Sequence, residues 1–145
     1  ILVNKWDLAS GTNVSAELYK EDMYTEFKDL QHYPILFVSA LTKRRVSNIL
    51  EKAWETFTKQ KEKLSTKDLN VWIEKAVKNY PPPATQGKSI KVKFVEQVQQ
   101  SPPIFALFSN YPKLISIQYL RYLHNQLRES FDLKGITIKF SLRKG

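Results

Sequence analysis

The sequence predicts two consecutive units that mix helices and strands, an α/β unit followed by an α+β unit. Residues 1–63 alternate strand, helix, strand and helix, whereas residues 64–145 follow the order helix, strand, strand, helix, strand. The first unit has ten Lys and Arg against nine Asp and Glu, a net charge of +1, and the second has thirteen against five, or +8. This contrast indicates separate modules, the second of which faces a polyanion.

Composition excludes several classes of site. The 145 residues include no cysteine, and the two histidines, His32 and His124, are far apart, which excludes disulfides and makes a zinc site improbable. No apolar run approaches the ~20 residues needed to cross a bilayer, so we expect a cytoplasmic protein. Because Ile1 already lies in a strand-like run, we also expect this chain to be a fragment of a longer protein.

In residues 1–63, strands are predicted at 1–3 and 35–38 and helices at 14–31 and 46–63. Tyr33-Pro34 ends the first helix, because a residue before proline avoids helical geometry. Each helix has apolar residues at helical spacing that we expect to face a core. These residues are Leu18, Met23, Phe27 and Leu30 in the first helix, and Val46, Ile49, Leu50, Ala53, Trp54 and Phe57 in the second.

In residues 64–145, Ser65 and Asp68 resemble a capping box that begins a helix with one apolar stripe, and Pro81-Pro82-Pro83 ends it. Alternating apolar residues predict strands from Ile90, at 104–108 and at 136–143. The helix predicted at 116–131 should bury one side and expose the other. We expect Leu120, Leu123, Leu127 and Phe131 on the buried side, and Arg121, Asn125 and Arg128 on the exposed side.

Two short stretches suggest guanine recognition. Asn4-Lys5-Trp6-Asp7 follows the first predicted strand, and a carboxylate such as Asp7 can accept both donors that guanine presents at N1 and N2. Ser39-Ala40-Leu41 follows the second strand. If the two strands are parallel, their carboxyl ends meet at one edge and both loops address the same base. Taken alone, Ser39-Ala40 is more typical of a simple strand-to-helix turn.

Together these stretches resemble the guanine end of a Ras-like GTPase domain. By that resemblance, Asp7 reads guanine N1 and N2, the stem of Lys5 covers the base, and the backbone N–H of Ala40 meets guanine O6. Asn4 would tie its loop to the neighbouring one. The guanine-binding candidates are Asn4, Lys5, Asp7, Ser39, Ala40 and Leu41.

The second unit resembles the C-terminal KH-like domain of the bacterial double GTPases called Der or EngA. The resemblance rests on its element order, on Pro81-Pro82-Pro83 and Ser101-Pro102-Pro103, and on residues 119–131. Residues 1–63 then look like the closing part of the second GTPase domain. The resemblance implies a parent enzyme that hydrolyses GTP to GDP, binds GTP or GDP with Mg²⁺, and acts in maturation of the large ribosomal subunit.

Two departures from these families limit the fragment itself. It has no P-loop, switch segments or acidic Mg²⁺ ligand, and Gly87-Lys88-Ser89 only imitates a P-loop because a strand follows it. We therefore expect no catalysis and no bound cofactor from this chain. The Gly-x-x-Gly loop with which KH domains clamp RNA is also missing, and residues 110–113 stand at that place.

The basic second unit leaves three functions open. It contacts 23S rRNA of the large ribosomal subunit, or it docks on a GTPase domain of the same chain, or the whole is a stand-alone KH-type RNA-binding protein without GTPase activity. The RNA-contact candidates are Lys91, Lys93, Arg121, Arg128, Lys139, Arg143 and Lys144. Each of them is equally compatible with an ordinary solvated face. The predicted strands at 1–3 and 35–38 would have unpaired edges, so we also expect self-association.

Overall fold

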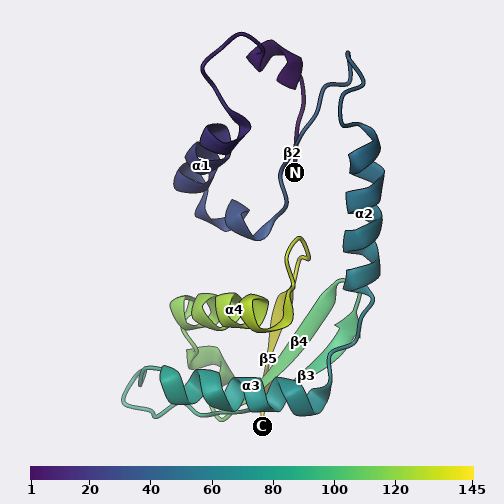
Figure 1. Cartoon of the computed structure of the whole chain (residues 1–145). Coiled ribbons are helices and arrows are strands. Elements are labelled where there is room, and N and C mark those ends of the chain that lie inside the picture. The colour runs from purple at the N-terminus through teal and green to yellow at the C-terminus, as the bar shows by residue number, and fades with distance from the viewer. The chain divides into compact units, whose positions relative to one another are not determined.

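The computed structural model describes residues 1–145, which form two compact units, Ile1–Thr58 and Lys59–Gly145 (Figure 1). Helix α2 (Ser47–Gln60) runs through this division, which lies a few residues before the boundary that the sequence suggested. None of the helices combines the length and the apolar character that a membrane crossing requires.

The first unit has the predicted order of strand, helix, strand and helix. Strand β1 (Leu2–Val3) and strand β2 (Leu36–Phe37) pair in parallel, with Leu2 opposite Leu36 and Val3 opposite Phe37. This pairing confirms that the two strands end at one edge. The connecting elements are η1 (Trp6–Ala9), α1 (Ala16–Glu26) and η2 (Lys28–His32).

The packing predicted for the first unit is partly wrong. The helix expected at 14–31 breaks at Phe27, whose φ of −125° and ψ of 82° are not helical, and η2 follows. The stripes expected to be buried are largely exposed, including Leu18 at 55%, Leu50 at 77% and Trp54 at 67%. The physical reason is the size of the sheet, since two strands of two residues each offer too little apolar surface to cover two helices.

The second unit also has the predicted order. It consists of α3 (Thr66–Asn79), β3 (Val92–Gln100), β4 (Pro103–Ser109), η3 (Pro112–Leu114), α4 (Ile117–Phe131) and β5 (Lys139–Lys144). The sheet has the order β3-β4-β5, with β3 and β4 antiparallel and β4 and β5 parallel. Ser65 and Ser116 cap the two long helices, each accepting a hydrogen bond from the backbone N–H three residues later.

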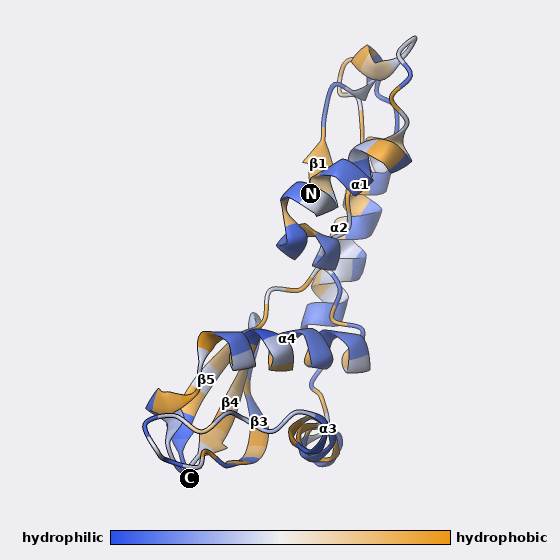
Figure 2. Ribbon diagram, turned by 90° about the vertical axis from the view of Figure 1, so that its left-hand side faces the viewer, coloured by the Kyte–Doolittle hydropathy of each residue, from blue (hydrophilic) through white to orange (hydrophobic).

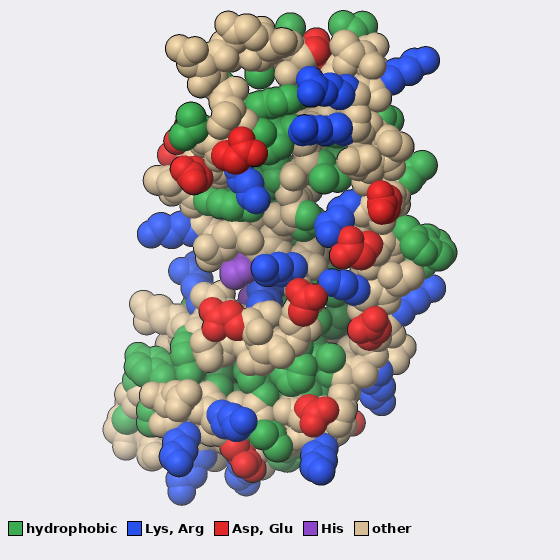
Figure 3. All heavy atoms as spheres, viewed as in Figure 1, with side chains coloured by type: hydrophobic (Ala, Val, Ile, Leu, Met, Phe, Trp, Pro, Cys, Tyr) green, Lys and Arg blue, Asp and Glu red, His purple; other side chains and the backbone are tan.

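Helices α3 and α4 share one hydrophobic core with one face of this sheet (Figure 2). Ile73 of α3 and Leu123 of α4 are buried in the same cluster as Val95, Phe105 and Leu107 of the strands. Because side chains alternate across a strand, their sequence neighbours point to the opposite face. Over α2 and α3, positive and negative side chains are interspersed on the face that Figure 3 presents, without a patch of one sign.

One polar contact joins α3 to the outer edge of β3. The Asn70 side chain donates from Nδ2 to the carbonyl oxygen of Val95 at 3.2 Å, and its Oδ1 accepts from the Val95 N–H at 3.1 Å. Strand β3 lies at the edge of the sheet, so these backbone groups have no neighbouring strand on that side. The amide of Asn70 therefore supplies the hydrogen bonds that another strand would make.

Candidate guanine-recognition site and basic surface

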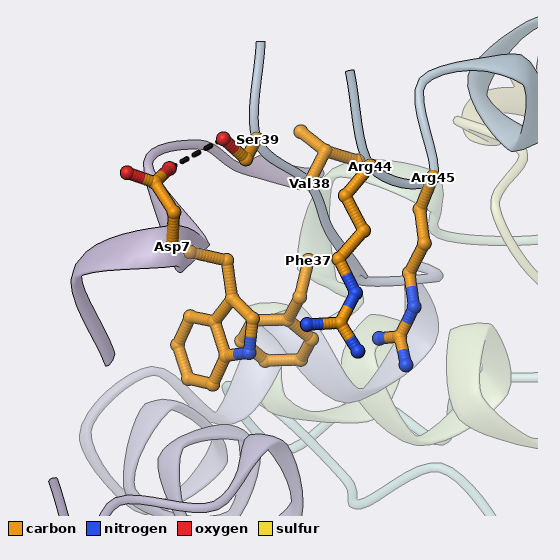
Figure 4. A pocket seen from close by; sticks show the side chains of 7 residues that line it. Asp7, Phe37, Val38, Ser39, Arg44 and Arg45 are labelled. Carbon is orange, nitrogen blue, oxygen red and sulfur yellow. Dashed lines mark hydrogen bonds between the residues drawn. The ribbon is translucent and has the colours of Figure 1, made fainter. Parts of the chain in front are cut away.

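The two loops suggested for guanine recognition lie together in the structure. Ser39, which is buried, donates a hydrogen bond from its hydroxyl to Oδ1 of Asp7 (Figure 4). The same hydroxyl oxygen accepts from the Thr42 N–H at 3.1 Å. The parallel pairing of β1 and β2 explains this proximity, because it delivers both loops to one edge of the sheet. The second oxygen of Asp7 has no hydrogen-bond partner in the chain and can accept one from a ligand.

Asn4 joins the two loops through their backbones, as the sequence predicted. Its Oδ1 accepts hydrogen bonds from the Lys5 N–H at 2.8 Å and from the Ala40 N–H at 3.1 Å. Ala40 was expected to direct this N–H toward guanine O6. In the structure the N–H is already used by Asn4, so Ala40 fastens the loops and does not present a free donor in this arrangement.

The remaining two candidates of the site are exposed. Lys5 adopts a left-handed backbone conformation with φ of 60°, at the point where the chain turns from β1 into η1. Leu41 is 84% exposed. Neither side chain is held by the core, so both are available to a ligand placed against Asp7, and their roles stay predictions.

Arg44 and Arg45 belong to the surroundings of Asp7, although the sequence assigned them no role beyond a basic turn. With Asp7, Ser39 and Trp6 they line a cavity of about 40 Å³, and Figure 4 shows both arginine side chains extending along it. The carbonyl oxygen of Arg44 accepts from the Ser39 N–H at 3.2 Å, which closes the turn. The cavity can hold water but not a purine, so a base could only lie outside it. The signal in the sequence was the position of Lys43-Arg44-Arg45, directly after Ser39-Ala40-Leu41-Thr42.

Six of the seven candidate cations of the second unit are exposed, namely Lys91, Lys93, Arg121, Lys139, Arg143 and Lys144. Five of these lie on β3 and β5 or, for Lys91, directly before β3. The structure thus gathers along one small sheet residues that are separated by up to about fifty positions in the sequence. Arg121 stands apart on α4.

The prediction that Arg128 is exposed is wrong. Its side chain is only 5% exposed and donates from Nη1 to the carbonyl oxygen of Leu133 at 2.6 Å and from Nη2 to that of Ile136 at 2.7 Å. These carbonyls lie in the turn between α4 and β5, which bends back over the end of the helix. Arg128 therefore satisfies buried backbone acceptors, and we withdraw it as an RNA contact.

Two tyrosines of α4 bind the C-terminal end of α3. The Tyr119 hydroxyl donates to the carbonyl oxygen of Tyr80 at 3.0 Å, and the Tyr122 hydroxyl donates to that of Ala76 at 2.9 Å. Burial raises the pKa of the Tyr119 phenol well above its usual range, with further increases from Tyr122 and Tyr80. These phenols stay neutral donors at physiological pH and hold the last turn of α3 against α4.

Comparison with known proteins places both units in one family. The profile described as "KH-domain-like of EngA bacterial GTPase enzymes, C-terminal" matches residues 63–143. Proteins named GTPase Der from Amoebophilus asiaticus, Flavobacterium johnsoniae and Chlorobium phaeobacteroides are 41%, 39% and 36% identical over 144 residues, or 99% of this chain. The chain spans 33% of the length of each of these relatives.

Proposed function

The chain belongs to the EngA family of bacterial GTPases, and from this premise we propose that it is the C-terminal portion of a GTP-hydrolysing protein that acts in biogenesis of the large ribosomal subunit in the cytoplasm. Its first unit is the guanine-reading end of a Ras-like GTPase domain. Its second unit is a KH-like module for contact with the ribosome. The likeness to relatives named GTPase extends over residues of both units, which disfavours a stand-alone RNA-binding protein.

The contact between Asp7 and Ser39 is the main support for guanine recognition by the first unit. The two residues are 32 positions apart and come from separate loops, yet one carboxylate oxygen of Asp7 is fixed by Ser39 while the other is free to receive a ligand. A carboxylate held in this way accepts N–H donors and rejects carbonyl oxygens. Guanine offers adjacent donors at N1 and N2, whereas adenine offers none there, so Asp7 would select guanine.

This chain contributes to the nucleotide site the groups around Asp7, which we assign to the base. It contains no cluster of three or more His, Cys, Asp or Glu side chains that could hold a metal ion. The edge formed by Asp7 fits a purine with two adjacent donors, as GTP and GDP have. We assign the contacts to phosphates and Mg²⁺ to other parts of the full-length protein, and we derive no catalytic step from this chain.

The substitution Asp7→Asn in the full-length protein tests the base assignment. The amide replaces one acceptor by a donor, which opposes the N2 amino group of guanine and matches the carbonyl that xanthine carries instead. Loss of a hydrogen bond to a charged group is worth roughly 1.5–3 kcal/mol, so GDP should bind about 10- to 100-fold more weakly, and XDP should bind more tightly. Asp22→Asn, on the exposed side of α1, is the control. An unchanged preference for GDP over XDP in the Asp7→Asn variant would refute the assignment.

For the second unit, the exposed cations along β3 and β5 favour a contact with ribosomal RNA. Phosphate contacts release counterions, so binding of 23S rRNA segments should weaken steeply between roughly 50 and 200 mM salt, and Lys91→Glu with Lys93→Glu should weaken it further. Lys75→Glu with Lys78→Glu, which makes the same change of charge at exposed positions of α3, controls for the loss of net charge alone. Docking on a GTPase domain is the second candidate. It would give weak RNA binding and a measurable affinity for a GTPase domain supplied separately.

A further inference from the structure

The sheet of the second unit has one face that neither long helix covers. Val95 and Leu107 point into the core shared with α3 and α4, so Phe94 and Phe108 point to the opposite side. On this side Phe94 is 40% exposed, and Lys139, Arg143 and Glu96 are exposed as well. We call this surface the open sheet face, and define it by Phe94, Glu96, Phe108, Lys139, Ser141 and Arg143.

Two aromatic rings are stacked on the open sheet face. Phe94 of β3 is the register partner of Phe108 of β4, and their ring centroids are 4.1 Å apart with planes inclined by only 13°. Because β3 is the edge strand, the ring of Phe94 has Phe108 on one side and the sheet edge on the other. Phe94 has its aromatic contact with Phe108 on one side and is 40% exposed, so the side of its ring away from Phe108 can receive another flat group.

Cations lie in the same rows as these rings. Phe108 is paired with Arg143 of β5, so one row across the sheet reads Phe94, Phe108 and Arg143. Lys139 occupies the same face near the other end of β5, opposite Ile104. Lys91 and Lys93, which shortly precede Phe94 in the sequence, are exposed, and Glu96 is the only acidic residue on the three strands. Open aromatic surface surrounded by positive charge matches a ligand that has both flat rings and negative charges.

We propose that the open sheet face binds single-stranded RNA, with one base stacked on the free side of Phe94 and the flanking phosphates contacted by Arg143 and Lys139. This inference rests on the proposed function, since it names the surface through which the second unit contacts ribosomal RNA. Stacking requires an unpaired base, so single strands are bound and duplexes are not. It also explains how a KH-like unit without a Gly-x-x-Gly loop can hold RNA, because neither a clamp nor a groove is needed.

Fluorescence anisotropy of the 145-residue chain tests this proposal, with labelled oligouridylate as the single strand and an RNA duplex of equal length for comparison. Phe94→Leu keeps an apolar side chain but removes the flat ring, and should weaken binding of the single strand at least about fivefold. Phe94→Trp should restore it, and its indole emission should be quenched by the stacked base. Arg143→Gln should reduce the slope of the logarithm of the affinity against the logarithm of the salt concentration by about one. Trp54→Leu, an exposed aromatic residue of α2, is the matched control and should change nothing.

The outcomes separate this proposal from the proposed function. If the wild-type chain binds the single strand with steep salt dependence and Phe94→Leu binds equally well, the stacking site is wrong while the RNA contact stands. Stronger binding of the duplex than of the single strand also overturns the stacking site. Co-sedimentation of the full-length protein with large ribosomal subunits tests the function itself. If the full-length protein co-sediments with large subunits and Phe94→Leu does not reduce the bound amount, the stacking site is refuted while the proposed function stands. If the full-length protein does not co-sediment, the proposed function is refuted. If Phe94→Leu weakens only the affinity for a GTPase domain, the open sheet face is a protein-docking surface and the RNA proposal is refuted.

Discussion

Replacing Arg128 by methionine should destabilise the second unit strongly, because this side chain holds the turn after α4. Its guanidinium donates to the carbonyls of Leu133 and Ile136 at 2.6 and 2.7 Å while being 5% exposed. A hydrogen bond from a charged group contributes roughly 1.5–3 kcal/mol. Two such bonds give about 3–6 kcal/mol, from which the relief of no longer burying a charge must be subtracted. We expect a net loss of about 2–4 kcal/mol in the free energy of unfolding.

The fluorescence of Trp72 can report this loss for the second unit alone. The chain has three tryptophans, of which Trp6 and Trp54 lie in the first unit and Trp72 is buried in the core of the second. Urea denaturation would therefore be followed in a background of Trp6→Phe and Trp54→Phe, with the midpoint and slope fitted together. Arg121→Met, on an exposed position of the same helix, is the control and should stay within about 0.5 kcal/mol of the wild type. A loss below about 0.5 kcal/mol for Arg128→Met would refute the reasoning that the guanidinium holds the turn.

Three further predictions concern other contacts. Asn70→Ala leaves the N–H and carbonyl of the fully buried Val95 without partners and should cost the second unit about 1–3 kcal/mol in the same assay, whereas Asn79→Ala at the end of that helix should cost little. Because the pKa of Tyr119 is raised in the folded state, folding favours the neutral phenol. The resulting stabilisation is complete below about pH 10, the usual pKa of tyrosine, and is lost as the pH rises further. Alkaline unfolding that Tyr119→Phe leaves unaltered would contradict this. The exposed Leu50 and Trp54 on α2 and the short paired strands favour self-association, so analytical ultracentrifugation should show a mass that rises with concentration and falls in Trp54→Glu, and a monomer at every concentration would exclude it.

The sequence predicted the order of elements in both units because the order follows from local patterns. Ser65 and Ser116 begin helices through contacts three residues away, and Pro81-Pro82-Pro83 follows the end of α3. The meeting of Asp7 with Ser39 was also predictable, since parallel strands bring their carboxyl ends together. Each of these inferences needs only residues close in sequence or one rule of sheet geometry.

What escaped prediction depends on contacts that periodicity does not encode. The apolar spacing of Leu50 and Trp54 indicates a buried face, but whether a face is buried is decided by the surface available to cover it. Arg128 occupies a polar position of α4 by spacing, yet the turn that follows folds over it and supplies carbonyl partners. The stack of Phe94 on Phe108 depends on strand register, which a bulge between Val92 and Phe94 shifts.

The contact of Asn70 with Val95 affects which substitutions the second unit can accumulate during evolution. Apolar packing between a helix and a sheet tolerates sliding, because one methyl group replaces another. The hydrogen bonds between the Asn70 side chain and the Val95 backbone do not tolerate sliding. If α3 shifted along β3 by one residue, Asn70 would face a residue whose N–H and carbonyl point the other way. Asn70 thus fixes the position of α3 along the strand. Core residues around it can be exchanged freely for others of similar volume, while the alignment of helix and strand is preserved.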